Sequence, residues 1–161
     1  MALPNPVFIV YEVNRDLEIL KPPIHGEVVS AHATAASAGA ALARVIASTE
    51  AAGHGGRFGR EYKTLLVSVP TVFVYDGSGN VPFTASGLAQ LHKRSELPPK
   101  PLKEAAVHVL ALEGDIGCGT QAIVGTRAEA EALVAKWRKQ GAACDQMPGF
   151  EFTYTKVAVE D

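Results

Sequence analysis

The sequence has little of several features that define large classes of protein. Its 161 residues include only two cysteines, too few for the disulfide scaffold of a small secreted domain. No apolar run approaches the ~18 residues that a membrane-spanning helix requires. The first residues contain neither a basic start nor a long apolar stretch, so we expect no secretory signal. We therefore expect a cytoplasmic protein, or one assembled into a particle that is made in the cytoplasm.

A strong charge of either sign is also absent. Fifteen Lys and Arg residues face seventeen Asp and Glu residues, which gives a formal net charge of −2. This balance argues against a protein that holds duplex DNA through bulk positive charge. The five histidines lie far apart in the chain, so no two share the close spacing of metal ligands on one helix or strand. We predict no metal site and no cofactor.

The patterns that are present indicate a globular α+β protein, with 47% hydrophobic residues. Residues 7–13 are β-branched and aromatic, which predicts a strand, and residues 27–30 predict a short return strand. A helix is expected over 35–52, with Thr34 as its N-cap. A third strand is expected over 62–69.

The second half of the chain repeats this order of elements. Thr126 and Glu129 have the spacing of a capping box, which places the start of the second helix. In the last strand Phe150, Phe152 and Tyr154 alternate with polar residues, as in a half-buried strand. In chain order, we expect a strand over 106–112, a loop over 113–120, a return strand over 121–125, a helix over 126–140 and a strand from 150.

Between the halves we expect a hairpin over 71–83, a short helix over 84–94 and a proline-rich connector. This organisation predicts a first half over 1–94, a connector over 95–103 and a second half over 104–161, packed as one compact domain. The predicted fold is α+β: duplicated β-β-α-β units forming a mainly antiparallel sheet with helices on one face, a ferredoxin-like sandwich. The unit resembles those of many small bacterial and phage proteins of unassigned role, a likeness that implies no function.

Three stretches could carry chemistry, and each has a simpler structural interpretation. The glycine-rich stretch 53–60 could bind an anion through His54, Arg57 and Arg60, but phosphate loops precede a helix and this one follows a helix. Cys118 lies between two glycines, and a nucleophile there would need a base such as His108. The stretch 76–80 has oxygen ligands but lacks the distal carboxylate of a calcium loop, so we expect a turn.

Charged residues also gather locally. Glu113 and Asp115 could be paired carboxylates, although acidic residues in a hairpin loop are normally solvated. Neither of the two basic clusters is interleaved with aromatic residues, so we interpret both as solvated faces. The first cluster comprises Lys93, Arg94, Lys100 and Lys103, and the second comprises Lys136, Arg138 and Lys139.

With no evident catalytic constellation, we expect a non-enzymatic interaction or assembly protein, an accessory subunit of a phage or bacterial complex. Its partner would be another protein or a second copy, bound through Phe150, Phe152 and Tyr154. The alternative is a small nucleotide- or anion-binding enzyme that uses residues 53–60. A second alternative is a binder of single-stranded nucleic acid, resting on Arg57, Phe58 and Arg60 with the lysines of 93–103.

Overall fold

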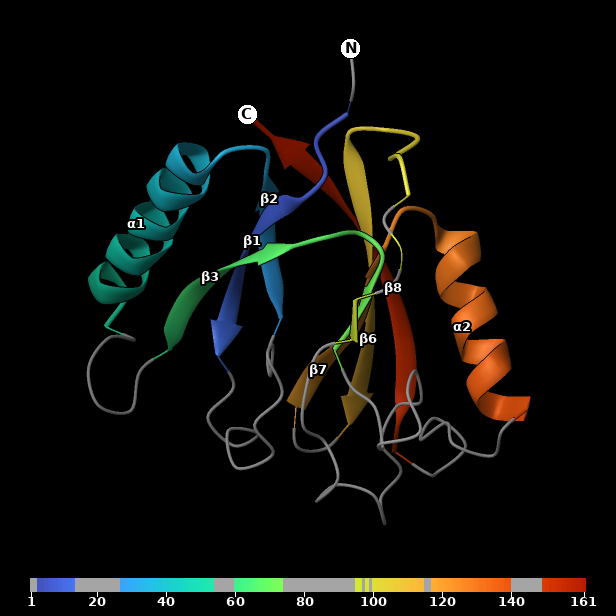
Figure 1. Ribbon diagram of the computed structural model, residues 1–161. Coiled ribbons are helices and arrows are strands. Elements are labelled where there is room, and N and C mark those ends of the chain that lie inside the picture. Colours follow the sequence, from blue (N-terminus) through green and yellow to red (C-terminus); the bar gives the residue numbers. More distant parts are fainter. Residues whose placement is uncertain are drawn as a thin grey trace.

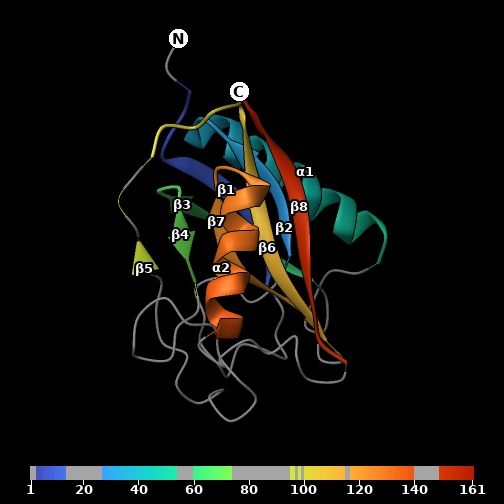
Figure 2. The ribbon, with the colours of Figure 1, turned by 90° about the vertical axis from the view of Figure 1, so that its right-hand side faces the viewer.

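The computed structural model describes residues 3–13, 27–53, 60–73, 95–96, 98, 100–114, 117–139 and 149–161. This part is mostly strands, with two helices, and forms a mixed sheet curled into a half-barrel (Figures 1 and 2). In chain order the elements are β1 (Val7–Val13), β2 (Val28–His32), α1 (Ala35–Ala51), β3 (Glu61–Val67), β4 (Thr71–Val72), β5 (Ser95–Glu96), β6 (Ala106–Gly114), β7 (Gly117–Val124), α2 (Arg127–Lys139) and β8 (Glu151–Glu160). The strands lie in the order β3-β1-β2-β8-β6-β7-β4-β5.

The first unit places β1 between β2 and β3 and antiparallel to both. α1 connects the two outer strands and packs against all three strands. Its buried residues are small, Ala38 and Ala41, and they contact Val10 on β1. Small side chains let the helix axis approach the sheet closely, as the alanine-rich sequence suggests.

The second unit has the same arrangement, with β6 between β7 and β8. α2 packs on its outer side through Val134 and Trp137. The Trp137 ring lies 6.0 Å from that of Phe152 on β8, measured between centroids. A large aromatic core therefore lies under α2, whereas α1 rests on alanines.

The units join where β2 and β8 run parallel, through the pairs Ala31↔Val159 and His32↔Glu160. The Ala33 N–H also donates to the carbonyl oxygen of Glu160 at 2.8 Å. Every other strand pair in the described part is antiparallel, so this short join makes the sheet mixed.

A single stretch of chain links the outermost strand β3 to the opposite side of the sheet. After β3 the chain bends, and β4 pairs antiparallel with β7. Val67, Val69 and Phe73 on this stretch are buried in the core on the inner face of the sheet. The chain thus closes the half-barrel by covering its interior.

Alternate residues of the strands fill two different cores. On the inner face, Ile9, Val107 and Val109 belong to one cluster inside the curl. On the outer face, Val10 contacts α1 and Leu110 lies in the cluster under α2. The strands are therefore buried on both faces over much of their length.

The predicted fold class is wrong. The two β-β-α-β segments are present, but the sheet is mixed and curled rather than a ferredoxin-like sandwich with helices on one face. A sandwich of that kind leaves its other face to solvent, whereas here that face carries Ile9, Val107 and Val109. Burying these residues requires the sheet to curl, and the curl carries α1 and α2 to separate parts of its outer surface (Figure 1).

Several local predictions can be compared with the structure. β7 begins at Gly117, inside the expected loop over 113–120. The last strand continues to Glu160 and pairs with β6 without interruption as far as Ala158. Its apolar residues change from even positions (Phe152, Tyr154) to odd positions (Val157, Val159), and this change occurs without a bulge. Residues 74–94 lie outside the described part of the chain. They include the expected turn at 76–80, all but the first three residues of the expected hairpin over 71–83, and the expected helix over 84–94.

Candidate interaction site between β2 and β8

Strands β2 and β8 meet at one end and separate toward the other (Figure 1). Within the described residues their ladder consists of the two pairs at Ala31 and His32. On β8, the Val159 N–H donates to Ala105 on the β6 side, while the Glu160 carbonyl accepts on the β2 side. Backbone groups alternate along a strand, so those of Phe152 and Lys156 also face the β2 side. Among the described residues no strand pairs with this part of the β8 edge, and we call the region beside it the gap between β2 and β8.

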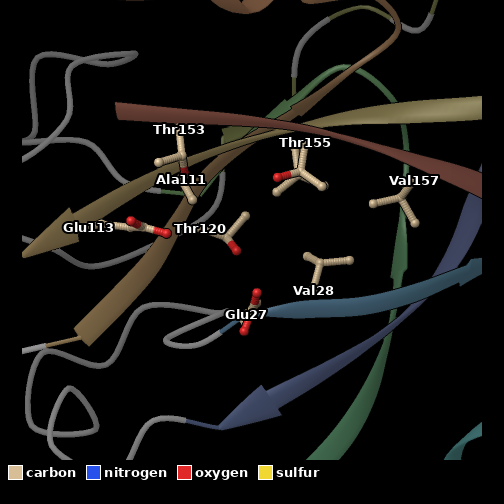
Figure 3. Close-up of a pocket in the computed structure, with 9 residues that line it drawn as sticks. Glu27, Val28, Ala111, Glu113, Thr120, Thr153, Thr155 and Val157 are labelled. Atoms are coloured by element: carbon tan, nitrogen blue, oxygen red, sulfur yellow. The ribbon is translucent and has the colours of Figure 1, made fainter. Parts of the chain in front are cut away.

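A hollow of about 40 Å³ lies on the inner face of the sheet beside this gap (Figure 3). Its wall combines threonine hydroxyls with valine and alanine, and two carboxylates stand beside them. Thr155 is exposed although it lies on the inner face, so the interior is open to solvent here. The lining residues are Glu27, Val28, Val109, Ala111, Glu113, Thr120, Thr153, Thr155 and Val157.

The acidic character of this hollow comes from two elements that the curl brings together. Glu27 directly precedes β2, and Glu113 lies near the end of β6. Glu113 is also directly opposite Glu151 in the β6–β8 ladder. Like charges opposite each other on neighbouring strands repel, so a cation near this end would relieve the repulsion. The arrangement can accept hydrogen bonds from an ammonium or guanidinium group.

The aromatic residues predicted to bind a partner, at the start of β8 and just before it, face α2 on the outer side of the sheet. Phe152 is 7% exposed and packs on Trp137, and Phe150 is partly buried against the same cluster. Tyr154 is partly buried, with the Arg127 guanidinium carbon 5.1 Å from the centroid of its ring. These rings anchor α2. A partner binding at β8 would therefore meet the backbone edge and the inner-face side chains.

His32 is a polar centre that the sequence analysis did not single out. The ring is fully buried, with Nε2 2.7 Å from the Ser30 hydroxyl and Nδ1 2.7 Å from the Ser37 hydroxyl. Glu160 Oε2 lies 3.7 Å from Nδ1. Burial lowers the pKa of His32, Glu160 raises it and Arg44 lowers it further. The Ser-x-His spacing places Ser30 and His32 on one strand face, but only the fold brings Ser37 and Glu160 to them.

The candidates for catalysis are not brought together. His108 pairs with Val124 at one end of the β6–β7 hairpin, and Cys118 pairs with Glu113 near the other end. Five residue steps along the strand separate these positions, a length of about 17 Å at about 3.3 Å per step. His108 instead lies with Nε2 3.2 Å from Glu104 Oε1. Glu104 also accepts a hydrogen bond from Lys156 at 2.6 Å, and these two hydrogen bonds lower the pKa of the Glu104 carboxyl.

Arg60 is the described member of the predicted anion-binding set. Its Nε lies 3.7 Å from Glu12 Oε1, and a hydrogen bond with the Tyr62 side chain raises the pKa of Arg60. An acidic neighbour at this distance weakens the attraction of Arg60 for an anion. His54, Arg57, Phe58, Lys93, Arg94 and Asp115 lie outside the described residues.

Comparison with protein-family models, curated proteins and solved structures gave no match. Among the described residues, no group of three or more His, Cys, Asp or Glu side chains could hold a metal ion. No helix in the same part of the chain is long and apolar enough to cross a membrane.

Proposed function

We propose that this chain is a protein-interaction module that receives an extended segment of a partner protein alongside β8, in the gap toward β2. The supporting observation is that β2 and β8 are neighbours in the sheet, yet within the described residues they share only two residue pairs. A strand edge left beside such a gap is a template for another strand. A role as an assembly subunit of a larger complex is the form of this function that the sequence favours.

The charges beside the gap favour a basic partner segment. A lysine or arginine side chain directed into the hollow would meet Glu27 and Glu113 and would offset the repulsion between Glu113 and Glu151. The threonine hydroxyls on the β8 side can hydrogen-bond to the same group. Main-chain pairing with β8 would supply affinity, and the acidic hollow would supply selectivity.

The size of the hollow also favours a macromolecular partner. About 40 Å³ holds one or two water molecules or the end of one side chain. Pockets for drug-sized ligands are about 300–1,000 Å³. A partner bound here would gain most of its contact outside the hollow, along the strand.

The test is selection from a displayed library of random peptides with the full chain as bait, followed by affinity measurements on the enriched peptides. We expect extended peptides with a central lysine or arginine. Thr155→Arg should weaken their binding by about tenfold or more, because it places a competing cation in the hollow. Thr155→Ser is the matched control and should bind as the wild type does.

Two results would overturn the proposal. One is selection that yields no peptide binding above that of an unrelated bait. The other is equal binding to the wild type and to Thr155→Arg, with circular dichroism showing both proteins folded. If the bait instead proves to be a stable oligomer by light scattering and Thr155→Arg dissociates it, a second copy supplies the segment, which supports the module.

A further inference from the structure

The fold brings members of the two basic clusters of the sequence to a single groove. Lys100 belongs to the first cluster, over residues 93–103, and Lys136 belongs to the second cluster, on α2. Both lie on the wall of a groove of about 230 Å³ between α2 and the bend that joins β3 to β4. The remaining lining residues are Pro70, Val124, Glu129, Ala132 and Leu133.

The lining is apolar at its centre and positively charged at its margins. Val124 is fully buried and Leu133 partly so, whereas Lys100 and Lys136 are exposed. In the part of the chain that the structure describes, neither ammonium group lies within 4.0 Å of a carboxylate. The groove thus presents two available cations beside an apolar surface.

Glu129 is the one acidic residue among the described lining residues, and hydrogen bonds at the start of α2 hold it in place. Glu129 Oε2 accepts a hydrogen bond from the Gly125 N–H at 3.2 Å, and the Glu129 N–H donates to the Thr126 hydroxyl at 3.2 Å. A carboxylate held in this way stabilises the N-terminus of α2. It is fixed beside the helix end, and the two lysines leave a net positive charge on the lining.

Both walls of the groove are fixed by contacts elsewhere in the fold. α2 is anchored by Trp137, which is fully buried. On the other side, the Asn5 side-chain amide donates to the carbonyl oxygens of Val69 and Lys100 at 3.0 and 2.9 Å. The Lys100 N–H also donates to the Val69 carbonyl at 3.3 Å. A groove held open in advance costs a partner less conformational entropy than one that must form on binding.

We infer that this groove docks an acidic segment of a protein partner, with one apolar side chain against Leu133 and flanking carboxylates at Lys100 and Lys136. The apolar centre distinguishes this occupant from a free phosphate. None of the described lining residues has an aromatic ring on which a nucleic-acid base could stack. Its charge is opposite to that of the β2–β8 hollow, so this is a second surface that takes a different segment.

The probe is a fluorescein-labelled hexapeptide with a central leucine flanked by aspartates, titrated with the full chain and followed by anisotropy. The double variant Lys100→Glu/Lys136→Glu should weaken binding by about tenfold or more. The matched control is Lys103→Glu/Lys139→Glu, which takes one lysine from each cluster but none from the groove. This control carries the same net charge and should keep most of the affinity.

A second pair of variants tests the groove by shape. Ala132→Tyr adds a ring inside the groove and should abolish binding, whereas Ala135→Tyr, exposed elsewhere on α2, should not. Because both positions are on the helix surface, circular dichroism should show both variants folded. Replacing the leucine of the probe with serine should also lower the affinity.

Three outcomes would overturn this inference. Equal losses in the two lysine double variants would show a diffuse charge effect. Equal affinity for the leucine and serine probes would show simple anion binding. Unchanged affinity in Ala132→Tyr would place the probe elsewhere on the surface. None of these results bears on peptide binding at β8, which is read out with a basic probe.

Discussion

At the scale of single residues, His32 connects three elements through its imidazole ring. Ser30 on β2 and Ser37 on α1 hold the two ring nitrogens, and Glu160 of β8 lies beside them. A neutral imidazole satisfies this arrangement, with one nitrogen donating and the other accepting. Protonation would place a positive charge on a fully buried side chain.

We predict that acidification destabilises the fold through His32. Its pKa in the folded protein is lowered from the ordinary value of 6.5, so the unfolded chain binds the proton first. The free energy of unfolding should therefore fall as the pH drops below about 6.5, and this loss should stop below the folded-state pKa. Urea unfolding between pH 7.5 and 5 measures the slope. The slope should decrease in His32→Asn and persist in His108→Asn, and equal slopes in the wild type and His32→Asn would contradict the prediction.

Trp137 is the largest fully buried side chain in the described part. It projects from α2 onto Phe152 of β8, and its removal would leave a cavity between the helix and the sheet. Trp137→Ala should lower the free energy of unfolding by about 3–5 kcal/mol. Urea unfolding gives the value, with Trp137→Phe as a control that keeps an aromatic ring and should lose less. A loss below about 1 kcal/mol in Trp137→Ala would mean that α2 is not anchored here.

At the scale of elements, the two helices differ in how their first turns are capped. The Thr34 hydroxyl accepts from the Ser37 N–H at 3.1 Å, and the Thr126 hydroxyl accepts from the Glu129 N–H at 3.2 Å. Glu129 also accepts from Gly125, one residue before the N-cap, rather than from the N-cap itself. The Ser37 hydroxyl is engaged with His32 instead of the backbone.

We therefore predict a larger effect of cap removal at α2. Thr126→Ala should lower the free energy of unfolding by about 1 kcal/mol, the usual value of an N-cap. Thr34→Ala should cost less, because no acidic residue in the first turn of α1 supports its cap. Chemical unfolding of the two variants decides the order. Negligible losses at both sites would show that these caps contribute nothing to stability.

The elements that the sequence predicts well are those defined by neighbouring residues. α1 begins at Ala35 after Thr34 and α2 begins at Arg127 after Thr126, as expected. β8 shows where this approach fails. Its outer-face residue Phe152 is buried by α2, while its inner-face residue Val157 contacts the core inside the curl. β8 is thus covered by α2 near its start and by the inner core near its end. The local sign of this in the sequence is that the apolar residues of the strand move from even to odd positions.

At the scale of the whole molecule, two units with the same strand order lie side by side in one sheet. The join pairs Ala31 with Val159, two residues from nearly opposite ends of the chain. No periodicity near either residue specifies the other, so the mixed sheet and the gap beside β8 could not be predicted locally. One feature of the sequence does indicate the curl. β1 has apolar residues on both faces, and such a strand must be buried against a core on each face.

The final closure of the fold depends on Asn5, which ties together three distant stretches. Its side-chain oxygen accepts from the Val69 N–H at 3.0 Å, and its amide donates to Val69 and Lys100. Val69 is buried, so Asn5→Ala would leave its N–H without this partner. We predict a loss of about 1–3 kcal/mol in the free energy of unfolding.

Hydrogen exchange distinguishes a local tie from a general loss of stability. In Asn5→Ala the amides of Val69 and Phe73 should exchange faster, while those at the centre of β1 should change less, because the bend can detach before the sheet opens. Asn5→Asp retains an acceptor for the Val69 N–H but loses the donor to the carbonyl oxygens of Val69 and Lys100, so Val69 should keep more protection than in Asn5→Ala. Uniformly faster exchange in Asn5→Ala would instead mean that the bend and the sheet open as one unit. In that case the stretch that links β3 to β4 would be an integral part of the half-barrel rather than a separate cover over its interior.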